Sequence, residues 1–287
     1  MKPLQGEIIV VDKPLGWSSF HVVKKLRGAL TSRLRKAGVR KLKVGHAGTL
    51  DPLASGVMIV CTGKATREIE RLQSGVKEYI ADIRLGATTP SFDRETPVDA
   101  TFPTEHITRE AVENALKGFI GRIEQIPPDY SACKVDGHRA YKMARKGETV
   151  ELKPKVIVID SIEILDFKDT LLVLRIVCSK GTYIRSVARD IGVALHTGAY
   201  LENLRRTQVG EARIEDALSI PKAVGILLSA PCTVEDDNGN EIVVEPMAVP
   251  QDFMLNEKAD IKPFDERSYR GRYRLMKIHI KDNRKQY

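Results

Sequence analysis

A glycine-rich loop around Asp51 is the segment of the chain best suited to chemistry. Between Gly45 and Gly56 the sequence reads GHAGTLDPLASG, with three glycines and one proline. Such a composition disfavours regular structure and lets a backbone approach a ligand closely. Pro52 biases Asp51 toward an extended backbone, so the carboxylate is held in a rigid setting. Asp51 is therefore the candidate catalytic group, and the alternative is an Asp-Pro step that only turns the chain.

A block of positive charge precedes this loop. The chain has a formal net charge of +8 and a sequence pI near 9.2, and no acidic residue lies between Asp12 and Asp51. The same stretch contains Lys24, Lys25, Arg27, Arg33, Arg35, Lys36, Arg40, Lys41 and Lys43. Such a block suits a polyanion, although a solvated helix face would carry the same charges. A second basic run with tyrosines spans 267–287 and suits either a polyanion or an extended tail.

The elements that must position these residues are strands and helices in irregular order. Apolar runs typical of strands are Glu7–Val11, Val57–Thr62, Tyr79–Leu85, Val156–Ile164 and Leu171–Cys178. Helical spacing of apolar residues predicts helices over 18–30, 108–120 and 183–195, with Ser18 as the N-cap of the first. Because strands and helices do not alternate at βαβ spacing, the pattern favours a mixed α+β fold over a doubly wound nucleotide-binding sheet.

Composition indicates a globular protein. A hydrophobic content of 42% over 287 residues supports one large domain, alone or with a small appendage. No apolar run approaches the roughly 20 residues of a membrane span, and the N-terminus lacks a secretory signal, so we expect a cytoplasmic protein. The cysteines Cys61, Cys133, Cys178 and Cys232 are scattered singly, which predicts neither a disulfide framework nor a metal site.

The Asp51 loop resembles motif II of the TruB family of pseudouridine synthases, and further segments match the family in its order. They are Asp12–Ser19, Gly63–Arg67, Lys77–Tyr79, Arg84–Asp93, Gln125–Ala132, Cys178–Arg185 and Leu204–Thr207. So many ordered matches across about 200 residues make chance a poor explanation. The resemblance implies an α+β fold with a largely antiparallel sheet flanked by helices.

The resemblance also implies isomerisation of uridine to pseudouridine, with Asp51 as the essential carboxylate. Arg185 would pair with Asp51, keeping it ionised and fixing its direction. Tyr79 would stack on the target base in the catalytic pocket, although a tyrosine in a strand-like run also suits a core. We expect no metal or organic cofactor, because the isomerisation involves no redox change and no incoming group.

By the same resemblance, the partner would be the T-arm of tRNA, with uridine 55 as the target in bacterial members. His46 would pack against the RNA where the flipped base leaves, and Tyr183 and Leu204 would line the pocket. The remaining residues expected to bind RNA are Lys13, Lys64, Arg33, Arg35, Lys36, Arg40 and Lys41. We expect a monomer that needs no obligate protein partner and does not bind a membrane.

The domain prediction places the catalytic domain in 1–219 and a separate C-terminal region in 220–287. That region suits either a divergent or partial PUA-like RNA-binding module or a short basic extension. Two other functions remain open at this point. One is an RNA-folding chaperone without turnover, for which a carboxylate facing phosphates would be unfavourable. The other is a guide-dependent synthase acting on ribosomal RNA, which would need protein partners.

Overall fold

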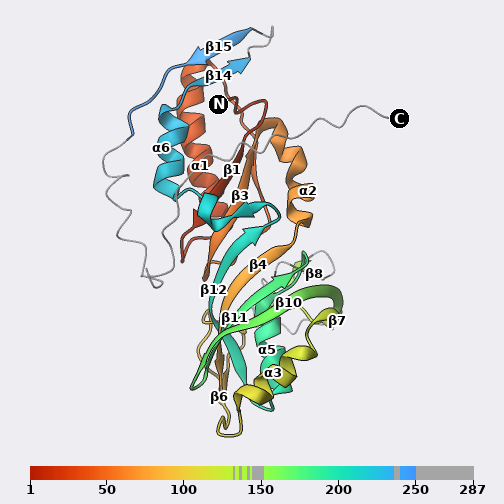
Figure 1. Ribbon diagram of the computed structural model, residues 1–287. Coiled ribbons are helices and arrows are strands. Elements are labelled where there is room, and N and C mark those ends of the chain that lie inside the picture. The colour runs from red at the N-terminus through yellow and green to blue at the C-terminus, as the bar shows by residue number, and fades with distance from the viewer. Residues whose placement is uncertain (132, 136–137, 141–142, 144–151, 236–239, 250–287) are drawn as a thin grey trace. The chain divides into compact units, whose positions relative to one another are not determined.

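The computed structural model describes residues 1–131, 133–135, 138–140, 143, 152–235 and 240–249 (Figure 1). These residues form two compact units. Unit 1 consists of Met1–Gln73 and the described residues from Glu211 onward, and unit 2 is drawn from Ser74–Gly210. Within the described residues, no helix is long and apolar enough to cross a membrane.

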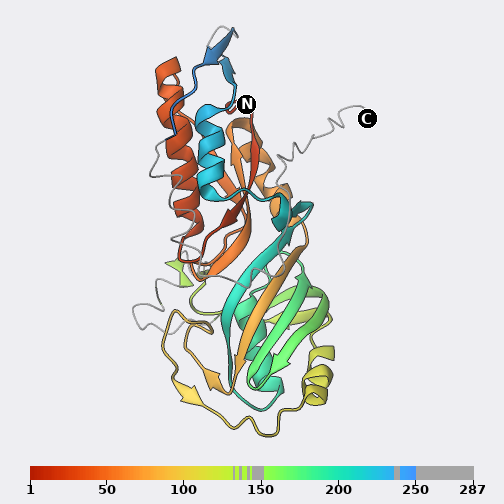
Figure 2. The same ribbon diagram turned by 60° about the vertical axis from the view of Figure 1, so that its left-hand side comes forward.

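Unit 1 contains short strands, helices and three 3-10 turns. Its elements are β1 (Ile8–Lys13), α1 (Ser19–Leu34), η1 (Arg35–Ala37), β2 (Val44–Ala47), β3 (Ala54–Thr62), η2 (Gly63–Glu68), α2 (Ile69–Ser74), β13 (Ala212–Arg213), η3 (Ile214–Asp216), α6 (Ile220–Ser229), β14 (Cys232–Glu235) and β15 (Glu241–Val244). β3 pairs antiparallel with both β1 and β2. α1 and α6 lie side by side in both ribbon views (Figures 1 and 2).

Helix α1 confirms the helix predicted from the spacing of apolar residues. Its side chains at i, i+4 and i+8, Leu26, Leu30 and Leu34, are fully buried in one apolar cluster. Leu227 of α6 and Met58 of β3 belong to the same cluster. The Ser18 side chain accepts a hydrogen bond from the His21 amide, as expected of an N-cap, and the helix runs one turn beyond the predicted end.

Unit 2 is built around one antiparallel sheet. Its elements are β4 (Lys77–Leu85), β5 (Ala87–Thr88), β6 (Ala100–Thr101), α3 (Arg109–Lys117), β7 (Gly121–Gln125), β8 (Lys134–Val135), β9 (His138–Arg139), β10 (Lys155–Lys168), β11 (Leu171–Cys178), α5 (Ile184–Ala194) and β12 (Ala199–Val209). The strand order is β12-β4-β11-β10-β7, and every neighbouring pair is antiparallel. The mixed α+β class with a largely antiparallel sheet is therefore confirmed.

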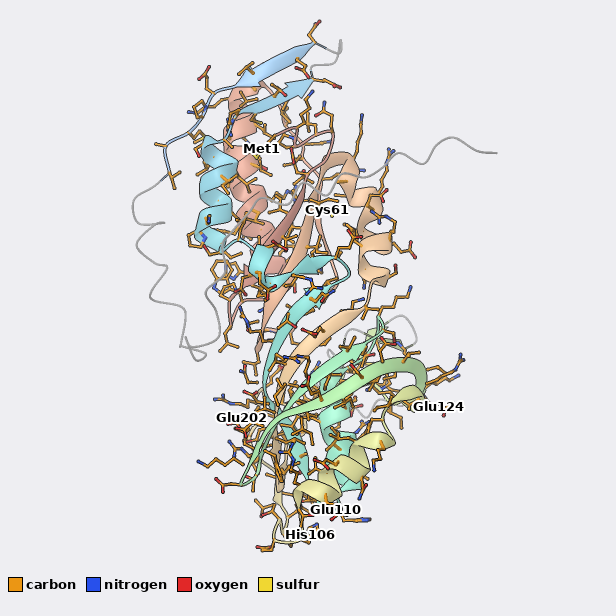
Figure 3. All side chains as sticks on the ribbon, in the orientation of Figure 1. Met1, Cys61, His106, Glu110, Glu124 and Glu202 are labelled. Atoms are coloured by element: carbon orange, nitrogen blue, oxygen red, sulfur yellow. The ribbon has the colours of Figure 1, made fainter. Side chains whose placement is uncertain are left out.

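Helices α3 and α5 lie beside this sheet (Figure 1). The Thr108 side chain accepts a hydrogen bond from the Ala111 amide and so caps α3. This confirms the predicted start of that helix. In Figure 3, Glu202 marks β12, where it forms an ion pair of 2.6 Å with Arg84 of β4. The sequence pattern did not predict β12, because charged and polar residues interrupt its apolar alternation.

The described part of the C-terminal region belongs to the packing of unit 1. Ser219 is the N-cap of α6, and Leu227 and Leu228 on that helix are buried in the cluster shared with α1. β14 and β15 pair antiparallel from Cys232↔Val244 to Glu235↔Glu241. The prediction of a PUA-like module or basic extension depends mostly on 250–287, including the second basic run, which lies outside the described residues. It stays a prediction.

Candidate active site

Hydrogen bonds from Ser19 and Gly16 hold the backbone of the Asp51 loop on both sides of Asp51, within unit 1. Ser19 Oγ accepts from the Leu50 amide at 2.8 Å and lies 2.9 Å from the Leu50 carbonyl oxygen, to which it donates. The Gly16 amide donates to the Pro52 carbonyl at 2.8 Å. Asp51 itself is half-buried. The backbone around Asp51 is therefore fixed, and the residue is partly accessible to solvent.

The loop is shorter than the sequence predicted. Gly45 lies within β2 and Gly56 within β3, so both glycines are paired in strands, and Gly56 has a φ of 108° at its paired position. Gly48 has a φ of 90°, which favours glycine at the point where the chain leaves β2. His46, on β2, is half-buried and pairs in register with Val60. The irregular segment is 48–53, with Asp51 near its centre.

The structure corrects the prediction that Lys13 binds RNA. Its side chain is fully buried, and its ammonium donates to the carbonyls of Pro14, at 3.0 Å, and Trp17, at 2.5 Å. An ammonium enclosed in this way does not reach a phosphate at the surface. Lys13 instead stabilises the turn whose Gly16 amide holds the Asp51 loop, so it is a positioning residue.

Arg33 is a second correction, because it points into unit 1 rather than outward. Its exposed fraction is 0%, and its guanidinium donates to the carbonyls of Leu227, Val244 and Glu245 at 2.9–3.1 Å. The prediction that Arg33 binds phosphate is therefore wrong. The other members of the set, Arg35, Lys36, Arg40, Lys41 and Lys64, are exposed and keep that prediction.

In unit 2, Arg185 lies in a buried polar network. The residue is 4% exposed, and its Nε lies 3.6 Å from Oδ2 of Asp93. Its other nitrogens donate to the carbonyls of Ser91, at 3.3 Å, and Tyr130, at 3.0 Å. Ser91 Oγ also donates to Asp93 Oδ1 at 2.6 Å. Asp93 was not among the predicted site residues, although it ends one of the matched segments. The predicted pairing of Arg185 with Asp51 joins residues of different units and stays a prediction.

The strand register brings Tyr79 and Leu204 to one face of the unit 2 sheet. Tyr79 pairs with Arg206, and Leu204 pairs with Ala81 two residues along β4 from Tyr79. Cross-strand partners share a face, and so do residues two apart on one strand. All four side chains are buried. The structure therefore places both predicted pocket residues on one face of the sheet and adds Arg206 to that face.

Tyr183 is fixed at the start of α5 by a paired amide. Its backbone N–H donates to Gln125 Oε1 at 2.8 Å, and its carbonyl accepts from Gln125 Nε2 at 3.1 Å. The Tyr183 hydroxyl lies 3.2 Å from the Cys133 sulfur, which also accepts a hydrogen bond from Lys155. Burial disfavours the Cys133 thiolate, but hydrogen bonds from Tyr183, Ser131 and Lys155 outweigh it and lower the pKa of Cys133. Burial, followed by the Cys133 sulfur, raises the pKa of Tyr183, so this hydroxyl stays protonated.

A cationic side chain lies near the start of β4. Burial, with a smaller contribution from Arg206, lowers the pKa of Lys77 to about 8. Its ammonium donates to the carbonyl of Gly75 at 2.6 Å. Lys77 precedes Tyr79 by two residues and lies on the same face of the strand, so Lys77 and Arg206 both lie on the face that carries Tyr79.

Comparisons with known proteins show the family to which the chain belongs. The profile described as TruB family pseudouridylate synthase (N terminal domain) matches residues 35–184. A protein from Phocaeicola vulgatus named tRNA pseudouridine synthase B is 64% identical over 216 residues, covering 75% of this chain and 91% of the relative. A protein of the same name from Flavobacterium johnsoniae is 47% identical over 218 residues, covering 76% and 94%.

Two solved structures are similar in fold. The structure of an H/ACA RNP bound to a substrate RNA containing 2'-deoxyuridine has a TM-score of 0.54 at 27% identity, covering 76% of this chain and 52% of that chain. A Cbf5-Nop10-Gar1 complex gives a TM-score of 0.56 at 22% identity, covering 88% and 82%. The second likeness concerns the fold alone.

Proposed function

The chain belongs to the TruB family of pseudouridylate synthases, and from that premise we propose that it isomerises uridine 55 in the T loop of tRNA, with Asp51 as its catalytic carboxylate. It is an isomerase acting on tRNA, as its relatives at 60–64% identity are named. Those names do not favour a chaperone or a guide-dependent enzyme. The observation that carries the assignment of Asp51 is its half-buried place in a loop fastened by Ser19 and Gly16.

The reaction explains why a carboxylate is needed. The bond from uracil N1 to ribose C1′ breaks, the base rotates, C5 bonds to C1′, the C5 proton leaves and N1 is protonated. A carboxylate promotes this sequence by nucleophilic attack or by removing a proton from the ribose, and both roles require the ionised form. Arg185 would favour that form of Asp51 and fix its direction. Asp93 would act through Arg185, because its carboxylate lies 3.6 Å from the Arg185 Nε.

Access to the target requires base flipping. A stacked uridine must leave its loop, at a cost of a few kcal/mol, before a carboxylate can reach its sugar. We assign Tyr79, Tyr183 and Leu204 to the pocket that receives the base, and His46 to the RNA where the base leaves. The protein would act as a monomer on the T-arm, since the reaction needs no second protein.

A direct test uses an unmodified tRNA transcript. Incubation with the purified protein should give pseudouridine at position 55 and leave a transcript with cytidine at that position unmodified. Mapping of pseudouridine by chemical adduct formation and primer extension gives the site. Modification only at another position would overturn the T-loop assignment, and no product from any tRNA would overturn the enzymatic one.

The exposed basic residues after α1 should contribute to tRNA affinity. Replacing Arg35, Lys36, Arg40 and Lys41 with glutamine should weaken tRNA binding and flatten the log–log salt dependence by about 0.7 to 0.9 per lost phosphate contact. Titrations at several salt concentrations measure this slope. Arg109→Gln, an exposed charge on α3, is the control. A slope equal to that of the wild type would show that these four residues face only solvent.

Tyr79 should matter more for turnover than for binding. Stacking of a base on an aromatic ring contributes about 1 to 3 kcal/mol, whereas phosphate contacts supply much of the affinity. Tyr79→Leu should therefore slow single-turnover pseudouridine formation far more than it weakens tRNA binding, and Tyr79→Phe should retain most of the rate. A Tyr79→Leu protein that melts at a lower temperature but has the wild-type rate per folded molecule would assign Tyr79 to the core.

A further inference from the structure

An exposed group of aromatic side chains lies beside the Asp51 loop within unit 1. This aromatic patch consists of Trp17, Phe20 and His21 at the N-terminal end of α1. The rings of Trp17 and His21 stack, with centroids 4.3 Å apart and planes 13° from parallel. Phe20 is 72% exposed, more than any other large hydrophobic side chain in the described part of the chain.

Packing accounts for only part of this patch. Trp17 precedes the N-cap of α1 and packs partly against the apolar cluster of unit 1, as in a hydrophobic staple. Phe20 projects into solvent and His21 is exposed, so neither is explained by the core. A single exposed apolar residue needs no explanation. Three aromatic side chains at the start of one helix, which is hydrogen-bonded to the Asp51 loop, indicate a ligand-binding surface.

The patch is fastened to the loop that carries Asp51. Ser19, which lies in the sequence between Trp17 and Phe20, makes both hydrogen bonds to Leu50. Gly16, immediately before Trp17, donates to Pro52. The two neighbours of Asp51, Leu50 and Pro52, are thus bonded to Ser19 and Gly16, which lie two residues after and one residue before Trp17. The aromatic patch and the Asp51 loop are therefore held next to each other within unit 1.

The charge around the patch selects the kind of ligand. Lys24 and Arg27 follow Phe20 at i+4 and i+7, so the three side chains share one face of α1, and both basic residues are exposed. No acidic residue lies in this part of the sequence. Aromatic rings for base stacking beside a basic track for the backbone are the combination used for single-stranded nucleic acid.

We propose that Trp17, Phe20 and His21 form a stacking subsite for an unpaired base of the substrate RNA loop, next to the uridine bound at Asp51. Lys24 and Arg27 bind the phosphates that continue from that base along α1. The exposed imidazole of His21 extends the Trp17 stack, and Phe20 gives the base a second apolar surface. This inference rests on the proposed function, from which it takes RNA as the substrate and Asp51 as the place of the target uridine.

Trp17 provides a direct probe, because it is the only tryptophan in the chain. A T-arm stem-loop RNA added to the protein should lower the quenching of Trp17 fluorescence by acrylamide. A blunt RNA duplex with the stem sequence supplies phosphates without unpaired bases and should leave the quenching unchanged. Shielding that grows with protein concentration in the absence of RNA would mean that a second copy covers the patch, and would overturn the proposal.

The matching affinity test uses Phe20, whose side chain projects into solvent and contributes little to the core. Phe20→Ala should weaken stem-loop binding about fivefold or more, whereas Phe20→Tyr should keep the affinity. Val243→Ala, at a side chain of 71% exposure in the same unit, is the matched control and should bind as the wild type. An unprotected Trp17, or an unchanged affinity of Phe20→Ala, overturns the subsite. If the wild type still forms pseudouridine in that case, the proposed function stands.

Discussion

Asp51→Asn should abolish pseudouridine formation while leaving tRNA binding intact. The amide keeps the shape of the side chain but has neither the charge nor the basicity of a carboxylate, so neither attack nor proton abstraction survives. Loss of such a group lowers turnover by about 10³-fold or more. Affinity should persist or increase, because the phosphate contacts remain and an anion near the RNA backbone is gone. Both quantities are measured on one folded preparation, as pseudouridine yield and tRNA affinity.

The control for this variant is Asp216→Asn, which makes the same chemical change at another half-buried carboxylate of unit 1. It should form pseudouridine at the wild-type rate. If the proposed pairing is correct, Asp51→Asn removes one carboxylate from the surroundings of Arg185, which keeps its ion pair with Asp93, so the loss of stability should be smaller than for a buried cation without any partner. Thermal melting separates that effect from chemistry. Appreciable product from folded Asp51→Asn would remove Asp51 from the catalytic role.

Arg33→Ala should give the largest loss of stability among the basic residues of the α1 region. The truncation leaves the carbonyls of the buried residues Leu227 and Val244, and that of the exposed residue Glu245, without their donor. Each unsatisfied group costs about 1 to 3 kcal/mol, and release of the buried charge offsets part of the sum, so we expect a loss of about 3 to 5 kcal/mol. The free energy of unfolding from urea titration measures it.

Two variants define what Arg33 contributes. Arg33→Lys keeps the positive charge but replaces a planar fork by a single ammonium, which cannot reach three carbonyls, so it should recover only part of the stability. Arg35→Ala removes a neighbouring exposed cation and should change the free energy of unfolding by no more than about 0.5 kcal/mol. Equal losses in the free energy of unfolding for Arg33→Ala and Arg35→Ala would contradict a stabilising role for the three hydrogen bonds of Arg33.

The sequence by itself determined the elements with strong local signals. Ser18 followed by apolar residues at helical spacing predicted α1, and apolar residues at the same spacing over 108–120 predicted α3. Glycines around the Asp-Pro step predicted an irregular segment at Asp51, because few other residues suit that backbone. The family resemblance, carried by ordered motifs, then supplied the chemistry for Asp51.

Tertiary structure alone decided which charged groups are buried and what they contact. Arg33 lies seven residues after Leu26 and three after Leu30, so its spacing placed it on the buried face of α1 although its charge suggested a surface. Its carbonyl partners come from α6 and from residues at and after the end of β15, about 200 residues later in the chain. Arg185 likewise meets Asp93 only through the folding of unit 2. A periodic pattern specifies the face of a helix, but the free energy of burying a cation depends on acceptors that distant segments bring to it.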